Sequence, residues 1–233
     1  AWFDFPEGSL LDLHNQNHLT SSTAFTITEG RRKLEAKDDE AEIFLVKPTI
    51  GNNILFNLAE HRPTYETNGI NNLHSLQFDQ TKTPFLDSNF TLNFNTDFSF
   101  YFCFKSSGTN SEFRPIVDFS NSATQGLSVL WKDTPESNYS GILKLIVNNQ
   151  ELVFENEPFI RDINVVNIEW NRKKERVFLS LNNSRLSSAQ KSLKNTAIHL
   201  NFSQTPMSLG KFYYDTENEL GNFNGFLSEI LYH

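Results

Sequence analysis

Hydrophobic and polar residues alternate along most of the chain from about residue 76 onwards. The run FTLNFNTDFSFYFCFK (90–105) alternates Phe and Leu with polar residues, and GILKLIVNNQELVFENE (141–157) does the same with aliphatic residues. Successive side chains of a strand point to opposite faces, so a period of two indicates strands rather than helices. The first of these runs predicts a strand that enters a fully buried position.

Residues typical of turns separate these runs. Asn148-Asn149 and Asn182-Asn183 are pairs that tolerate positive φ, and Arg172-Lys173-Lys174 lies between two strand-like runs as a solvated hairpin turn. MSLGKF (207–212) and FNGFLSEILYH (223–233) are two further short strands. Short strands at regular spacing predict an all-β, two-sheet antiparallel sandwich. We expect one domain over residues 1–233, with 1–60 as less regular N-terminal strands and loops packed on it.

Helical patterns are weak. Residues 35–46 and 187–195 are the two short helix candidates, and neither carries a convincing apolar stripe. In FNGFLSEILYH, alternation places Phe226, Ser228, Ile230 and Tyr232 on one face and Leu227, Glu229 and Leu231 on the other. Both faces are then largely apolar, which is typical of a central strand.

Composition supports a folded core and excludes some classes of protein. Hydrophobic residues make up 38% of 233, with 22 Phe. The net charge of −8 and the pI near 5.3 disfavour a nucleic-acid binder, which needs a basic surface for phosphates. No apolar run reaches the roughly 18 residues of a membrane span. The single Cys103 excludes an internal disulfide framework and is expected to be an inert buried thiol.

The N-terminus, AWFDFPEGSLLDL, has neither a basic nor a continuous apolar region of the kind found in signal peptides. Its aromatic residues Trp2, Phe3 and Phe5 would form a sticky patch if they were exposed. We expect them to form a strand of the chain's own sandwich. The alternative is an anchor to a partner subunit.

The order of features from Arg62 to His233 resembles the concanavalin A-like lectin/glucanase superfamily, in its laminin-G-like jelly-roll branch. The residues that carry the resemblance are RPTYETNGINNLHSLQFDQ, FTLNFNTDFSFYFCFK, RPIVDFS with GLSVLW, VNIEWNRKKERVFLSLNN, and MSLGKF followed by FNGFLSEILYH. Asn182-Asn183 stands where the family has an Asn-Gly turn. In the first element Asn68-Gly69 would be a tight turn, Leu76 and Phe78 would begin a core strand, and His61 and His74 would decorate turns.

The resemblance implies two facing antiparallel sheets and a binding or adhesive role. Domains that open in this way occur in bacterial surface proteins and in phage structural proteins, so the expected location is a virion or an extracellular surface. The expected function is a non-catalytic, lectin-like recognition or adhesion module, for example a phage decoration, fibre or tail component. The expected partners are surface glycans or capsid and tail subunits, including further copies of the chain. A purely structural lattice protein is the first alternative.

A polysaccharide-degrading enzyme is the second alternative. Glucanases of the superfamily carry two acidic residues at alternate positions of one strand, where both reach one glycosidic bond. The nearest patterns are Glu155-Asn156-Glu157, which runs into Pro158, and Asp38-Asp39-Glu40-Ala41-Glu42 in an irregular segment. Neither lies inside a buried alternating strand, so we expect no enzymatic activity.

Sugar sites combine an aromatic platform with polar groups that fix hydroxyls. The best candidate cluster is the loop containing Trp131, Asp133, Asn138 and Tyr139, and the second is Tyr213-Tyr214 with Asp215. For Trp131 core packing is an equal alternative, because GLSVLW alternates and places Trp131 on the face of Val129.

No cofactor is expected, and calcium is the metal that the candidate residues suit. Laminin-G-like sandwiches sometimes bind it at the rim through Asp side chains and backbone carbonyls. The candidate ligands are Asp118, Asp133 and Asp215. The alternative is that these Asp residues only cap turns.

Overall fold

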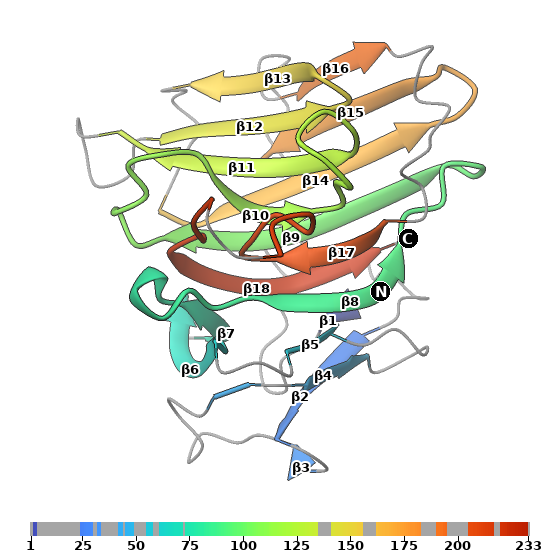
Figure 1. Ribbon diagram of the computed structural model, residues 1–233. Helices are drawn as coiled ribbons and strands as arrows, with labels where there is room; N and C mark the ends of the chain where they lie inside the picture. Colours follow the sequence, from blue (N-terminus) through green and yellow to red (C-terminus); the bar gives the residue numbers. More distant parts are fainter. Residues whose placement is uncertain are drawn as a thin grey trace.

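The computed structural model describes residues 2–3, 24–29, 32–33, 42–43, 45–48, 55–57, 61–71, 73–134, 141–155, 162–182, 190–194, 205–216 and 220–232. Within these ranges the regular secondary structure consists of strands, apart from a 3-10 turn at Gln80–Lys82. The strands form the two antiparallel sheets of a jelly-roll sandwich, as predicted (Figure 1). No helix in the described ranges is long and apolar enough to cross a membrane.

One sheet, called here the back sheet, has the last strand of the chain near its centre. Its strands lie in the order β6–β7–β18–β9–β14–β15–β16, and every neighbouring pair is antiparallel. The bounds are β6 Thr64–Ile70, β7 Leu73–Phe78, β9 Phe98–Ser106, β14 Asn164–Asn171, β15 Arg176–Leu181, β16 Gln190–Lys194 and β18 Gly225–Tyr232.

The front sheet packs against it. Its strands lie in the order β8–β17–β10–β11–β12–β13, again antiparallel throughout. The bounds are β8 Leu86–Thr91, β10 Arg114–Asp118, β11 Leu127–Asp133, β12 Gly141–Val147, β13 Gln150–Glu155 and β17 Pro206–Leu209.

Short N-terminal strands connect the two sheets into one hydrogen-bonded network. From the front sheet, β8 pairs with β5 (Leu55–Phe56), β5 with β4 (Leu45–Pro48), and β4 with β2 (Ala24–Glu29), which also pairs with β3 (Arg32–Lys33). Strand β1 (Trp2–Phe3) runs parallel to β2 and antiparallel to β18, with Trp2 opposite Leu231. Trp2 and Phe3 therefore belong to the chain's own sheets, as expected, while Phe5 lies outside the described residues.

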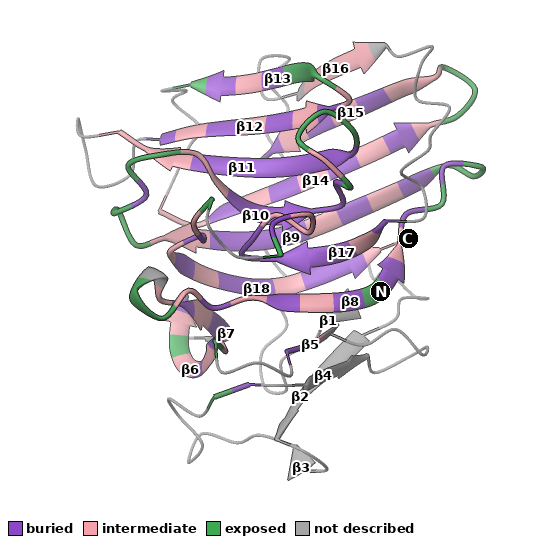
Figure 2. Ribbon diagram, viewed as in Figure 1, coloured by how far each residue is buried: buried purple, intermediate pink, exposed green. Residues whose placement is uncertain are grey.

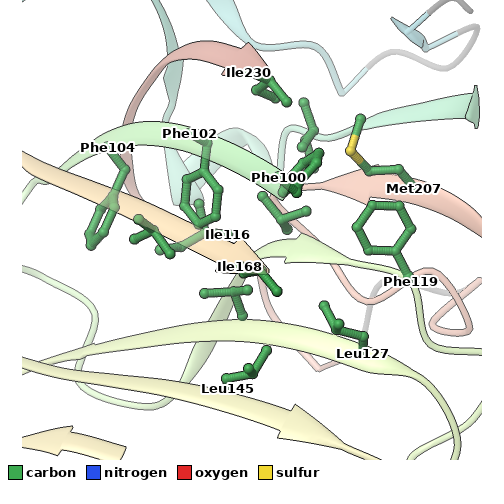
Figure 3. Close-up of a cluster of buried hydrophobic side chains, with 14 of the residues drawn as sticks. Phe100, Phe102, Phe104, Ile116, Phe119, Leu127, Leu145, Ile168, Met207 and Ile230 are labelled. Carbon is green, nitrogen blue, oxygen red and sulfur yellow. The ribbon is translucent and has the colours of Figure 1, made fainter. Parts of the chain in front are cut away.

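The core lies between the two sheets and is rich in Phe (Figure 3). Phe100, Phe102 and Phe104 of β9 are each at most 1% exposed and contact one another in sequence along the strand. From the front sheet, Ile116 and Leu127 reach the same cluster. Figure 2 shows the resulting alternation of buried and partly exposed positions along β12, β14 and β15. The residues that alternate in the sequence therefore point alternately into the core and towards the surface.

Two predicted turns behave as expected. Asn148 and Asn149 have φ values of 45° and 67° and connect β12 to β13. Residues 172–175, which include the basic cluster, form the exposed turn between β14 and β15.

The helix candidates are wrong where the structure describes them. Residues 190–194 form β16, which pairs with β15 from Ser180 to Arg176. Leu45 and Val46 belong to β4, while Glu42 and Ile43 lie outside any helix. Residues 35–41, 44, 187–189 and 195 lie outside the described residues. Pairing with other strands decides the conformation of both stretches.

The predicted turn at Asn68-Gly69 is also wrong. Both residues lie within β6, and the chain turns at Asn71, whose φ is 51°. A Cβ at Gly69 would lie 1.8 Å from the Ser75 Oγ on β7, so the glycine permits a close approach of two strands. Leu76 and Phe78 do face the core.

Strand β18 is central, between β9 and β7, but it does not alternate strictly. Its register with β9 shifts between Ser228 and Ile230, and Glu229 has a φ of 46°. One extra residue in a strand makes a β-bulge. As a result Leu227 and Ile230, three positions apart, both reach the core.

Candidate functional site

The connection between β17 and β18 crosses the outer face of the front sheet beside β10 (Figure 1). It brings Asp118, which the sequence offered only as a calcium ligand, next to the predicted sugar cluster of Tyr213, Tyr214 and Asp215. We call residues 212–215 the aromatic turn.

Asp118 reaches this face through the register of β10. Val117 is a core residue and pairs with Val129 and Leu209, so the next side chain, Asp118, points outward together with its partners Ser128 and Ser208. An outward carboxylate is normally exposed. Asp118 is nevertheless 0% exposed.

The Asp118 carboxylate accepts hydrogen bonds from three segments. The Ser120 Oγ and the Ser128 Oγ donate to it from the same sheet region, the former at 2.6 Å to Oδ2. The Tyr213 backbone N–H donates to Oδ2 at 2.7 Å. Burial raises the pKa of Asp118 to about 6, and these hydrogen bonds oppose that rise. Asp118 thus fixes the aromatic turn to the sheet.

The aromatic turn is a β-turn. The Asp215 N–H donates to the Phe212 carbonyl at 3.1 Å, which places Tyr213 and Tyr214 at the two corner positions. All three aromatic side chains are partly exposed. The Phe212 and Tyr214 rings lie 5.3 Å apart at an interplanar angle of 34°. The turn therefore places three neighbouring, partly exposed aromatic side chains at the surface.

The far end of the connection is also held. The Leu220 N–H donates to the Asp215 Oδ2 at 2.8 Å, and the Arg114 guanidinium donates to the Leu220 carbonyl at 2.6 Å. Burial raises the pKa of Tyr214, and the charges of Asp118 and Asp215 add to that rise. The Tyr214 hydroxyl therefore stays protonated at neutral pH and can donate a hydrogen bond.

Trp131 lies in the core and does not form a surface platform. Its side chain is 2% exposed and packs edge-on against Phe104 at 5.1 Å. Its indole N–H donates to the Asp133 Oδ1 at 2.7 Å. The face it shares with Val129 is the core face, which is the packing alternative raised by the sequence.

Asp133 holds the loop between β9 and β10, residues 107–113, in place. Its Oδ2 accepts from the Ser106 hydroxyl at 2.8 Å and from the Asn110 backbone N–H at 2.7 Å. Asn110, 0% exposed, also exchanges hydrogen bonds with the backbone of Asn224. The Asp133 oxygens thus face N–H and O–H donors, as in a structural carboxylate. The other predicted members of this cluster, Asn138 and Tyr139, lie outside the described residues.

The three candidate calcium ligands do not meet in one place. Ser128, the partner of Asp118, is five residues from Asp133 along β11, which is roughly 17 Å at the rise of a strand. Among the described residues, His, Cys, Asp and Glu form no group of three or more that could hold a metal ion. Asp118 and Asp215 act in the described structure as hydrogen-bond acceptors for backbone N–H groups.

The acidic patterns considered for catalysis are separated or incomplete in the described residues. Glu155 is exposed at the end of β13, and residues 156–158 lie outside the described ranges. Glu42 is exposed and lies 3.9 Å from Arg62, while residues 38–41 also lie outside.

Sequence reasoning missed Phe212 and the hydroxyls around Asp118. The sequence predicts one strand over MSLGKF, ending in Phe212, whereas β17 ends at Leu209 and Gly210 follows with a φ of 84°. The run Phe-Tyr-Tyr-Asp, which follows Gly210-Lys211, was the available signal. Ser120 and Ser128 gave no signal, because their partner is a buried carboxylate that only the sheet register identifies.

No protein-family model matches the chain, and no curated protein matches it in sequence. Solved structures do resemble it. The CBM40 domain of a Ruminococcus gnavus sialidase, solved with alpha2,3 sialyllactose bound, is 9% identical with a TM-score of 0.41, over 59% of this chain and 75% of that one.

Two other similar structures come from different proteins. A heptameric SAP-like pentraxin from Limulus polyphemus is 14% identical, with a TM-score of 0.41, over 58% of this chain and 63% of the pentraxin. A mutant of HCR D/C VPI 5995 is 13% identical, with a TM-score of 0.45, over 82% of this chain and 48% of that protein. At these identities and TM-scores, the ligands of these proteins do not identify a ligand of this chain.

Proposed function

We propose that this protein is a non-catalytic, lectin-like recognition module that binds glycan at the aromatic turn. The observation that carries the proposal is the pair of neighbouring aromatic side chains, Phe212 and Tyr214, both partly exposed on a β-turn. Sugar rings present apolar C–H faces and hydroxyls, and a partly exposed aromatic with polar neighbours suits both. Display on a virion or an extracellular surface would bring the turn into contact with such ligands.

The turn is also preorganised, which favours binding. Its backbone is held by Asp118 from below and by the Leu220–Asp215 hydrogen bond at its far end. Ordering a loop on binding costs free energy, so a loop fixed before the ligand arrives binds more tightly. The same fixation keeps the tyrosine positions constant between the free and the bound protein.

The test is a glycan array that includes neutral, amine-bearing and acidic glycans, followed by titration calorimetry with the best ligand. Tyr214→Ala should weaken binding about tenfold or more, which is about 1.4 kcal/mol. Tyr214→Phe keeps the ring and should retain most of the affinity. Phe178→Ala, a partly exposed aromatic of β15 on the opposite sheet, is the matched control and should bind like the wild type.

Three results would contradict the proposal. Unchanged affinity in Tyr214→Ala would move the site elsewhere on the molecule. A chain that binds no glycan on the array and is found only in large assemblies would favour the structural lattice protein. Release of shortened oligosaccharides from a bound polysaccharide would favour the glycosidase.

A further inference from the structure

Negative charge predominates around the aromatic turn. Asp118 lies beneath Tyr213, and Asp215 is the last residue of the turn. The charges of both carboxylates act on the Tyr214 hydroxyl. A ligand stacked on the Tyr214 ring therefore enters a field produced by two carboxylates.

Two cations of the described residues lie near the aromatic turn, and both have partners. The Lys211 ammonium lies 3.6 Å from the Asp87 carboxylate and 3.7 Å from the centre of the Phe85 ring, and Lys211 is only 6% exposed. The Arg114 guanidinium donates to the Leu220 carbonyl. Arg114 offsets part of the negative charge, but the two carboxylates leave an excess. The net charge of −8 for the whole chain adds to it.

The ring faces act in the same direction as the carboxylates. An aromatic ring carries negative charge density on its faces and attracts a cation placed over it. The Phe212 and Tyr214 rings lie side by side and partly exposed. A carboxylate on a ligand would meet repulsion from both sources, whereas an ammonium would be attracted by both.

We infer that the aromatic turn selects sugars that carry a free, protonated amine over their N-acetylated counterparts, and that it rejects carboxylate-bearing sugars. This inference rests on the proposed function, because it names the ligand class of the same site. It does not concern the neutral parts of the ligand, which the ring faces would bind in either case.

The experiment compares matched ligands by titration calorimetry at pH 6.5 in 20 mM and 300 mM NaCl. The first pair is a glucosamine tetramer and an N-acetylglucosamine tetramer, and the second is lactose and alpha2,3-sialyllactose. We expect the amine-bearing tetramer to bind about three- to tenfold more tightly than the acetylated one in 20 mM NaCl. The ratio should shrink in 300 mM NaCl, because salt screens exposed charges. Lactose should bind better than sialyllactose.

Three variants locate the source of the preference. Asp215→Asn removes one charge but keeps an oxygen for the Leu220 N–H, so the ratio between the two tetramers should fall towards one. Glu155→Gln removes one charge from an exposed position at the end of β13 and is the matched control, with an unchanged ratio. Tyr214→Ala should abolish the preference together with most of the binding.

The outcomes separate the inference from the proposed function. If none of the four ligands binds and the array shows no other glycan, both fail. If sialyllactose binds as well as lactose, or if the two tetramers bind equally, the inference fails while the glycan site stands. A preference that persists in both Asp215→Asn and Tyr214→Ala would be general attraction to an acidic protein and would overturn the inference. Thermal melting of each variant shows whether it is folded, and the salt dependence of the wild type tests the inference without any variant.

Discussion

The burial of Asp118 cannot be inferred from the residues next to it in the sequence. In RPIVDFS the aspartate falls on the outward face, where a solvated carboxylate would be expected. It is buried because a segment 95 residues later in the chain covers it and donates the Tyr213 N–H. Alternation could therefore predict the face on which Asp118 lies, and it could not predict its burial.

This burial predicts an unusual pH dependence of stability. The folded-state pKa of Asp118 is about 6, above the ordinary value of 3.8, so the folded protein binds a proton more tightly than the unfolded chain. Stability from this group is therefore greatest below pH 4 and falls as the pH rises through 6, by about 3 kcal/mol in total. Urea unfolding at intervals from pH 4 to 7.5 measures the effect.

Asp118→Asn isolates the contribution of Asp118 to the pH dependence of the free energy of unfolding, because an amide does not titrate. Other carboxylates contribute equally to the wild type and to the variant and cancel in the difference. The wild type should lose stability relative to Asp118→Asn between pH 4.5 and 6.5. A difference that stays constant over this range would mean that Asp118 titrates like an exposed carboxylate.

At the scale of single elements, the sequence predicts what depends on neighbours along the chain. Alternation identified β9, β12 and β14, and the paired asparagines identified the turn between β12 and β13. The sequence offers residues 187–195 as a helix candidate, and this prediction fails at β16 because pairing with β15 sets the conformation there. The Phe212–Tyr214 ring pair was missed in part for a related reason, since a strand that ends early releases Phe212 to the surface.

The bulge in β18 gives a prediction at the same scale. Glu229 adopts a φ of 46°, a region that is costly for residues with a Cβ and that glycine enters freely. Glu229→Gly should therefore be more stable than Glu229→Ala by about 1 kcal/mol. Both variants lose the carboxylate, so the comparison isolates the backbone, and urea unfolding of the two proteins measures it. Equal stability, or a more stable alanine variant, would mean that the bulge stores no strain.

At the scale of the whole molecule, the two sheets share one Phe-rich core, and β9 lies near the middle of the back sheet between β18 and β14. Cys103 is on β9 and is 2% exposed. Burial, with a smaller contribution from the charge of Glu229, raises the pKa of its thiol well above the ordinary range. Because the thiolate is the reactive form, the native thiol should be inert.

Cys103 should accordingly report opening of the whole sandwich. A thiol reagent in excess should label the native protein only at the rate of global unfolding, and one equivalent should react at once in urea. The labelling rate should match the unfolding rate measured by fluorescence at the same urea concentration. Rapid labelling under native conditions would show that the back sheet opens locally around β9.

The position of β18 has a consequence for how the protein is made. During translation, β9, β7 and β14 leave the ribosome well before residues 225–232, yet β18 is the partner that lies between β7 and β9. Until it arrives, the Phe-rich edge of β9 has no strand on that side, and unpaired apolar edges are prone to join other chains. Yield of folded protein should thus depend on chaperones or slow nascent-chain release more than its equilibrium stability would suggest.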